Sequence, residues 1–236
     1  MFQSHLDFAV YQPGEASRLL GVQTAKIKRW LSGYSYRRGD KIVEQAPLWI
    51  PEHTGHDELY LGFRDLMEIR FVQSFVRAGL GKNSLRSLLA KARDMVGHDY
   101  PLSTRRFQTD GQTLFLEAWG NEQGSSTEQT IDVRDGQHAF RSLISPTFKD
   151  LDFDEGVVSK WHIAGRRKGI SLAPTIAFGQ PVIDETGIPT SRLLEAFEAE
   201  GDEAAVARQF EIPLAAVRSA ITFEQELANK SAPTGR

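Results

Sequence analysis

The sequence predicts an α+β chain that is mostly helical, with an N-terminal winged helix-turn-helix, a β-hairpin-containing middle and a small C-terminal helical domain. Three observations predict this class. Apolar residues recur every three to four positions within the first hundred residues and again after residue 190. Two Asp-Gly pairs, at 110–111 and 135–136, are typical of hairpin turns. Charge is also distributed unevenly along the 236 residues, although the formal net charge is only −3.

The N-terminal segment opens with two short helical patterns separated by Gly21, a residue suited to a tight turn. The apolar positions are Ala16, Leu19 and Leu20 in the first pattern and Ile27, Trp30 and Leu31 in the second. The polar positions of the second helix are Gln23, Thr24, Lys26, Lys28 and Arg29. We therefore expect a helix-turn-helix whose second helix buries its apolar stripe and presents a polar, basic side.

The stretch that follows, "YSYRRGDKIVEQAPLWIPE", reads as two short strands around a Gly-Asp turn, with Arg37 and Arg38 at the tip of a wing. An α-helix fits the major groove of DNA, lysine and arginine reach phosphates, and glutamine, threonine and arginine can read base edges. The pattern predicts a DNA interface formed by the second helix and the wing. The competing interpretation is an ordinary solvated, charged helix face.

The remaining elements follow in order. Amphipathic helices are expected at 61–100, where the stripes of 63–77 and 83–96 are predicted to form a dimer interface. The Asp-Gly pairs predict stacked hairpins in a β-rich middle segment at 101–175. Three short helical patterns predict an acidic helical domain at 176–228, and residues 229–236 are expected to be disordered.

Local charge distinguishes the two ends of the chain. Residues 11–41 hold seven lysines and arginines against two acidic residues, a net charge of +5. Residues 190–228 hold three arginines against eight acidic residues, a net charge of −5. The basic end suits an anionic polymer, whereas the acidic end repels phosphate, so we interpret its helices as a protein-contact or packing module.

Metal binding and catalysis find no support in the sequence. There is no cysteine, which excludes disulfides and thiolate ligands. His53 and His56 have no other ligand types nearby, and the acidic run 150–155 lacks a recognisable second group of ligands. Neither a phosphate-binding glycine loop nor a nucleophile elbow occurs. We expect a protein that is not an enzyme and has no cofactor or metal.

The N-terminus "MFQSHLDFAV" lacks the basic region and apolar core of a signal peptide. No apolar run approaches the roughly 18 residues that a membrane-spanning helix needs. The expectation is a soluble, cytoplasmic protein with no membrane contact.

Two blocks resemble known families. "YQPGEASRLLGVQTAKIKRWL", with the wing and the helices after it, resembles the MerR-like winged helix-turn-helix. "FGQPVIDETGIPTSRLLEAF" and the residues that follow are similar to the helical family called domain of unknown function 433. Chains that join both blocks resemble VapB-type antitoxins. This resemblance implies a dimeric autorepressor that binds operator DNA and neutralises a PIN-domain (VapC-type) ribonuclease toxin.

Two alternatives stay open. One is a one-component MerR-like transcriptional regulator in which the middle segment senses a small molecule. The other, an outlier, is a metal-dependent nuclease that uses the acidic run 150–155.

Overall fold

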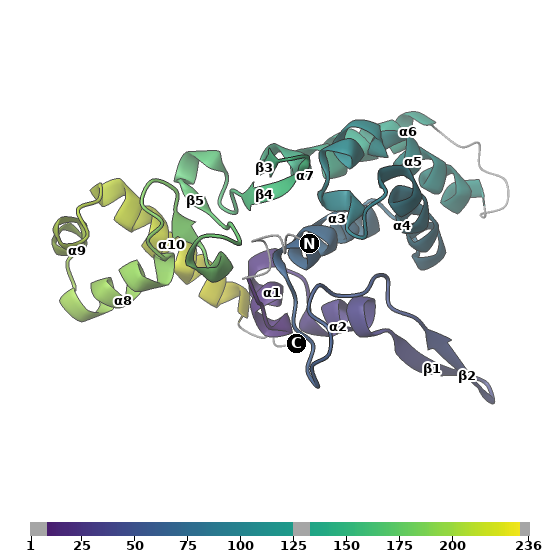
Figure 1. Cartoon of the computed structure of the whole chain (residues 1–236), viewed down its shortest axis with the longest axis horizontal. Helices are drawn as coiled ribbons and strands as arrows, with labels where there is room; N and C mark the ends of the chain where they lie inside the picture. Colours follow the sequence, from purple (N-terminus) through teal and green to yellow (C-terminus); the bar gives the residue numbers. More distant parts are fainter. Residues whose placement is uncertain (1–8, 125–132, 232–236) are drawn as a thin grey trace.

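The structure, a computed structural model, describes residues 9–124 and 133–231. Figure 1 shows an N-terminal part with a protruding hairpin, a helical body above it, and a C-terminal module at the opposite end. The N-terminal part contains α1 (Pro13–Leu20), α2 (Thr24–Ser32), β1 (Tyr34–Arg38) and β2 (Lys41–Gln45). The body contains α3 (Phe63–Arg77), α4 (Lys82–Val96), η2 (Pro101–Ser103), α5 (Arg105–Gly124), α6 (Val133–Ala139), the π-helical turn η3 (Phe140–Ile144) and α7 (Ser145–Lys149).

The helix pair α1–α2 forms where the apolar spacing predicts it. Gly21 ends α1 with a φ of +63°, a left-handed conformation that costs a glycine little, and its N–H bonds the Ser17 carbonyl. Ile27 and Leu31 of α2 are fully covered. The two strands of the hairpin pair antiparallel, from Tyr34 opposite Gln45 to Arg38 opposite Lys41.

Trp30 is less buried than the apolar spacing predicts. Its ring packs against the core but is only partly buried, because it lies at the edge of α2 beside a cavity. The Lys26 ammonium sits 5.0 Å from the ring centroid. Ile27 and Leu31 therefore hold α2 in place, and Trp30 contributes less than a fully buried tryptophan would.

Helix α3 is the centre of the body. Its apolar side chains are nearly all inaccessible to solvent, because α1 packs on one side and η2, η3 and α7 on others. Aromatic rings of α3 meet rings from α5 and α7, with neighbouring centroids 4.6–6.3 Å apart. The rings belong to Phe71, Phe75, Phe107, Phe115 and Phe148.

The structure removes the reason for predicting a dimer interface at 63–77 and 83–96. The stripe of α4 packs against α5, and α3 is enclosed by the body, so both apolar surfaces are covered within one chain. The sequence does not reveal this cover, because the covering helix α5 contains the Asp-Gly pair that predicts a hairpin.

The two predicted hairpins are also wrong: Asp110-Gly111 lies inside α5 and Asp135-Gly136 inside α6. Each glycine is used for close packing rather than for a turn. A Cβ on Gly111 would come within 2.8 Å of the Phe107 ring, and a Cβ on Gly136 within 2.9 Å of Trp119 on α5. The polar stretch between them lies partly outside the described residues.

The described residues of the segment 101–175 are consequently mostly helical up to residue 149, and the chain then forms a small hairpin, β3 (Leu151–Asp154) and β4 (Val157–Trp161). The acidic run 150–155 is mainly strand β3. Short antiparallel strands β5 (Ile170–Ser171) and β6 (Val182–Ile183) lead into the C-terminal module.

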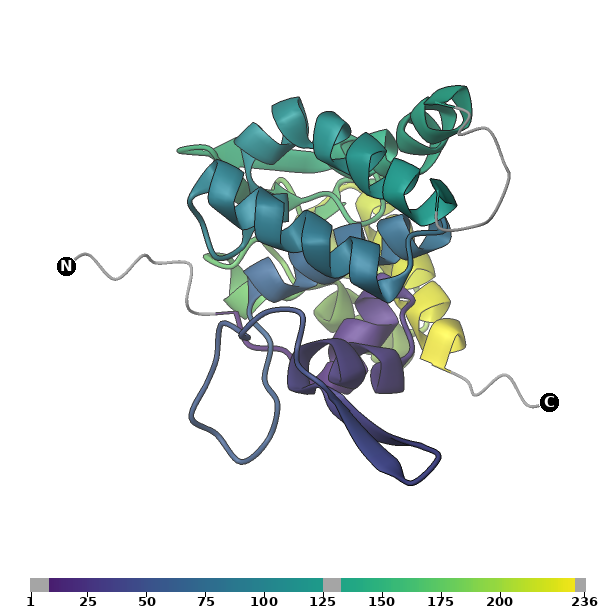
Figure 2. The same ribbon diagram turned by 90° about the vertical axis from the view of Figure 1, so that its right-hand side faces the viewer.

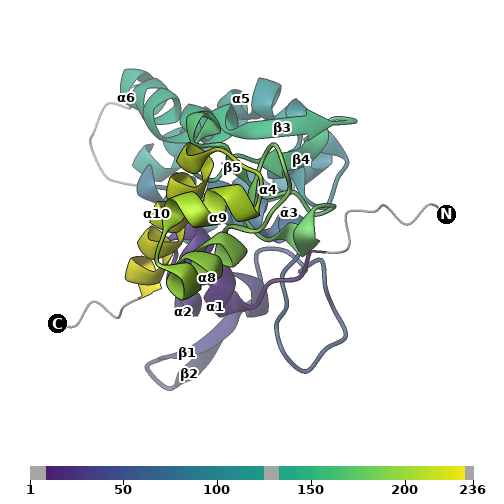
Figure 3. The ribbon, with the colours of Figure 1, turned by 90° about the vertical axis from the view of Figure 1, so that its left-hand side faces the viewer.

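The C-terminal module consists of three helices that pack on one another (Figure 3). They are α8 (Thr190–Glu200), α9 (Glu203–Gln209) and α10 (Leu214–Ser231). Asp202 caps α9 by accepting the Ala204 N–H at 2.9 Å. Helix α10 continues to Ser231, so residues 229–231 are helical rather than disordered, and residues 232–236 lie outside the described residues.

The module is attached to the N-terminal helix pair through a buried contact. The Tyr11 hydroxyl donates to the Gly179 carbonyl at 2.7 Å, and Tyr11 itself exchanges two backbone hydrogen bonds with Leu61. Helix α10 also packs against α1. The two ends of the chain, expected from the sequence to be separate units, therefore share an interface.

Two buried carboxylates of α3 hold neighbouring segments in place: Asp65 holds the loop between β2 and α3, and Glu68 holds η2. Asp65 accepts hydrogen bonds from the Trp49 indole at 2.7 Å and from the backbone N–H groups of Glu52 and Gly62. Glu68 accepts the Ser103 N–H at 3.1 Å and is 1% exposed. Burial raises the pKa of Glu68 from 4.5 to about 8, although backbone donors and Arg93 act in the opposite direction.

This burial predicts a pH-dependent stability. The folded chain keeps a proton on Glu68 that the unfolded chain releases above about pH 4.5, so the free energy of unfolding falls as the pH rises from there to about 8. At about 1.4 kcal/mol per pKa unit, the loss amounts to a few kcal/mol. Glu52, whose pKa burial raises to about 7, acts in the same direction.

Glu68→Gln should flatten this pH profile and stabilise the protein at pH 8, because the amide is uncharged and its oxygen can still accept the Ser103 N–H. Urea unfolding between pH 5 and pH 8 measures the effect. Parallel profiles for the wild-type and variant proteins would show that Glu68 does not carry it.

Candidate nucleic-acid interface and acidic module

The outward side of α2 and the hairpin beside it carry most of the predicted contact residues. Gln23, Lys28 and Arg29 are exposed, and Thr24 at the start of α2 is partly buried. Arg37 and Arg38 are exposed on β1, next to the turn at which the hairpin projects from the molecule (Figure 2). Helix and hairpin thus lie at one end of the chain and present four cationic side chains to solvent.

Lys26 differs from the other predicted contact residues. Its ammonium donates to the Gln73 side chain of α3 at 3.0 Å and stacks over Trp30. Burial, followed by the nearby Arg77, lowers its pKa. Lys26 is engaged within the chain and secures α2 to the body.

A cavity of about 400 Å³ separates α2, the hairpin and α4. Its basic lining residues are Lys26 and Arg29 of α2 and Lys82 and Arg86 of α4. The sequence alone does not point to Lys82 or Arg86, because only the fold brings α4 next to α2.

Helix α4 also positions the segment after the hairpin. Arg86 donates to the carbonyls of Ala46 and Pro47, and Arg93 donates to the Leu48 carbonyl at 2.7 Å. These charge-assisted bonds fix the base of the hairpin on the body. The direction in which Arg37 and Arg38 project therefore depends on α4.

The acidic residues of the C-terminal module differ in their partners. Glu226 pairs with Lys168 outside the three helices, and Glu224 accepts a hydrogen bond from the Thr190 hydroxyl. Some pair within the module, namely Glu195 with Arg192, Asp202 with Arg208 and Glu203 with Arg218. Glu198, Glu200 and Glu211 are exposed, and no ion pair within 4.0 Å joins them to the part of the chain that the structure describes. The module therefore presents uncompensated negative charge.

A polar cluster connects β3–β4 to the lead-in of the module. His162 lies between Asp152 and Asp184, with nitrogen–oxygen distances of 2.8 and 3.2 Å. Although partial burial alone would raise the pKa of Asp152, hydrogen bonds from His162 and Arg166 hold it below its usual value. Arg166 thus belongs to this cluster.

The cluster is not arranged as a nucleophilic triad. Ser171 donates to Asp184 rather than to His162, so the imidazole does not contact the serine oxygen. Within residues 9–124 and 133–231, no three His, Cys, Asp or Glu side chains are grouped so as to hold a metal ion. In the same residues, none of the helices has the length and apolar character needed to cross a membrane.

Comparison with known proteins gives three findings. The chain is 26% identical over 225 residues to a protein of Mycobacterium tuberculosis (strain ATCC 25618 / H37Rv) named "Putative antitoxin VapB45", covering 91% of this chain and 93% of that one. The crystal structure of Rv2018 from Mycobacterium tuberculosis shares the fold, with a TM-score of 0.59, 21% identity, and coverage of 89% of this chain and 96% of that one. Residues 170–223, which contain β5, β6 and most of the C-terminal module, match the family described as protein of unknown function (DUF433).

Proposed function

We propose that this protein is the antitoxin of a type II toxin–antitoxin pair, which binds operator DNA as an autorepressor and neutralises a PIN-domain ribonuclease toxin. The observation that carries the proposal is the placement of exposed cations on α2 and the hairpin at one end, with an uncompensated acidic module at the other. The similarity to an antitoxin along 91% of the chain supports it.

In this proposal, α1 and α2 form a helix-turn-helix and the hairpin is its wing. Gln23, Thr24, Lys28 and Arg29 face the major groove, and Arg37 and Arg38 contact the adjacent phosphates. Lys26 supports α2 from behind. One short helix reads few base pairs, so we infer that a homodimer engages two half-sites.

The second half of the proposal concerns the toxin. A ribonuclease must present positive charge to RNA phosphates, and the acidic module is complementary to such a surface. Glu198, Glu200 and Glu211 are the exposed carboxylates available to it. Because nearly all of the described chain is folded, the proposed contact is between preformed surfaces.

Replacing Lys28 and Arg29 by alanine should weaken binding to the DNA upstream of the protein's own reading frame. Both side chains are exposed and lie away from the buried Ile27–Leu31 stripe, so the fold should not change. Each lost phosphate contact lowers the slope of log binding constant against log salt concentration by about 0.9 in magnitude. The slope of the double variant should therefore be smaller by nearly 2. Fluorescence anisotropy across a salt series measures both quantities.

The matched control replaces Arg192 and Arg208, two exposed arginines of the acidic module, by alanine. It removes the same charge from a distant surface and should leave affinity and salt slope nearly unchanged. Equal losses for the two double variants would contradict the assignment of α2 as the DNA-contacting helix.

A further inference from the structure

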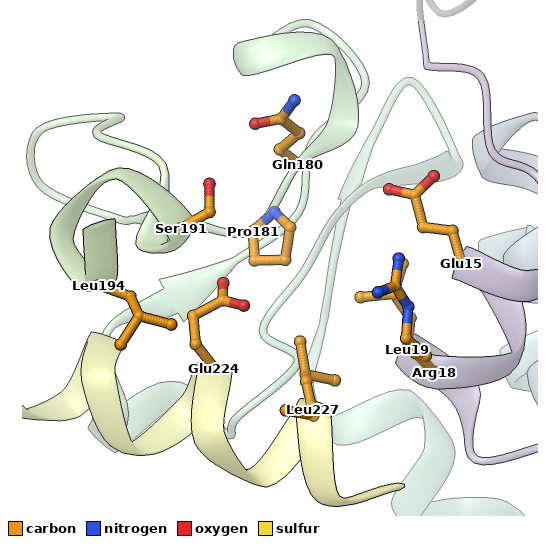
Figure 4. A pocket seen from close by; sticks show the side chains of 10 residues that line it. Glu15, Arg18, Leu19, Gln180, Pro181, Ser191, Leu194, Glu224 and Leu227 are labelled. Atoms are coloured by element: carbon orange, nitrogen blue, oxygen red, sulfur yellow. The ribbon is translucent and has the colours of Figure 1, made fainter. Parts of the chain in front are cut away.

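A cavity of about 360 Å³ opens where α1 meets the C-terminal module. Figure 4 shows side chains entering it from α1 on one side, from Pro181 and α8 on another, and from α10 below. Its apolar walls include Leu19 of α1, Leu194 of α8 and Leu227 of α10. Clefts of this size and mixed lining are typical of places where small groups bind between two units of a protein.

The charges around this cavity do not cancel. Glu15 and Arg18 of α1 and Glu224 of α10 line it, which leaves one negative charge in excess. Within the described residues, neither Glu15 nor Arg18 has an ion-pair partner within 4.0 Å. Glu224 accepts a hydrogen bond from the Thr190 hydroxyl and so is held in position.

Partial burial raises the pKa of the Glu15 carboxyl, against the opposing effect of Arg18 three residues along the helix. A desolvated carboxylate with a weak internal partner gains more from a nearby cation than an exposed one does.

We propose that this cavity is a binding site for a cationic group, an ammonium or guanidinium, carried on a short apolar stem. Glu15 and Glu224 receive the cation, and the leucine walls cover the methylene groups of the stem. This chemistry occurs in free alkylamines and alkylguanidines and in the side chains of lysine and arginine. The occupant contacts α1 and α10 together and so stabilises the junction between the two ends of the chain.

The test uses the full chain, without DNA or toxin, so its outcome is independent of the proposed function. Calorimetric titration is performed with n-butylguanidinium, representing a free ligand, and with the tripeptide Ac-Ala-Arg-Ala-NH2, representing a protein side chain. Binding of either probe is expected, and the probe that binds more tightly identifies the source.

Glu15→Gln and Glu224→Gln should each weaken binding by roughly tenfold, the usual scale for a lost charge-assisted contact. The glutamine at 224 still offers an oxygen to Thr190, and thermal unfolding checks that the fold is intact. If Glu224→Gln does not fold, Glu15→Gln decides the matter alone. Glu198→Gln, an exposed carboxylate of α8 outside the cavity, is the matched control and should change nothing.

Arg18→Gln tests the direction of the electrostatic effect. Because it removes the cation that lines the cavity, the probe should bind more tightly. A purely structural role for Arg18 predicts no such gain. The proposal is overturned if neither probe binds, if binding survives both glutamate substitutions, or if Arg18→Gln weakens it.

Discussion

Gly179→Ala should destabilise the protein by about 4 kcal/mol, the combined effect of backbone strain, a steric clash and a lost hydrogen bond. An added Cβ would lie 2.2 Å from the Tyr11 hydroxyl and 2.6 Å from the Ala9 Cβ, both in the tightly packed junction. The residue also has a φ of +78°, which costs a non-glycine residue about 1–2 kcal/mol. The steric clash and the loss of the buried hydrogen bond each destabilise the fold by a similar free energy. For a chain of this size, the thermal midpoint should fall by roughly 10 °C.

Gly201→Ala is the matched control. Gly201 ends α8 with a φ of +70°, but a Cβ there meets nothing within 4 Å. The Gly201→Ala variant carries only the backbone strain of a positive φ, so its thermal midpoint should fall by only a few degrees. If the two variants unfold at the same temperature, the Tyr11–Gly179 contact does not hold the module to the helix pair.

Glu198→Lys combined with Glu200→Lys should slow association with the toxin by at least tenfold at low salt. The two substitutions change the net charge of residues 190–228 from −5 to −1 without touching a buried side chain. Electrostatic steering changes association rates by factors of about 10 to 1,000, and the effect shrinks as salt screens it. Stopped-flow mixing with the purified product of the adjacent reading frame, at several salt concentrations, measures the rate.

Asp57→Lys combined with Glu58→Lys is the control for total charge. Both residues are exposed in the loop before α3, far along the sequence from the module, and the substitutions add the same positive charge. A similar slowing by both pairs would indicate a response to overall net charge and would remove the reason for assigning toxin contact to the module.

The elements that the sequence predicts well are those whose pattern is local. Ala16, Leu19, Ile27 and Leu31 recur at helical spacing around a single turn glycine, and α1 and α2 occupy those residues. Pro213 likewise lies directly before α10, whose apolar residues recur at helical spacing. In these segments, propensity, capping and apolar period favour the same structure.

The sequence-based predictions are wrong where the role of a residue depends on a packing partner elsewhere in the chain. Asp-Gly is a turn signal only if the glycine needs its backbone freedom, whereas Gly111 and Gly136 are required for their lack of a side chain beside Phe107 and Trp119. If residues 105–119 formed a hairpin, the apolar surface of α4 that α5 covers would have no partner in the chain. For this reason the sequence predicts a dimer interface there.

In the candidate site, too, local spacing predicts some side-chain positions and not those that depend on distant residues. The exposure of Lys28 and Arg29 follows from their phase relative to Ile27, which a sequence reveals. The inward direction of Lys26 depends on Gln73, and the support of the hairpin depends on Arg86 and Arg93. The cavity between α1 and α10 involves residues more than 160 positions apart, which no local pattern can connect.

Neutralisation of the proposed toxin can be measured in a growth assay. The reading frame adjacent to this protein's gene is expressed under one inducible promoter and this chain under another. We expect that the neighbour alone arrests growth, that co-expression of this chain restores growth, and that the two proteins purify as a complex. Growth arrest that persists at equal or excess levels of this folded chain would show that the chain does not neutralise the product of the adjacent reading frame.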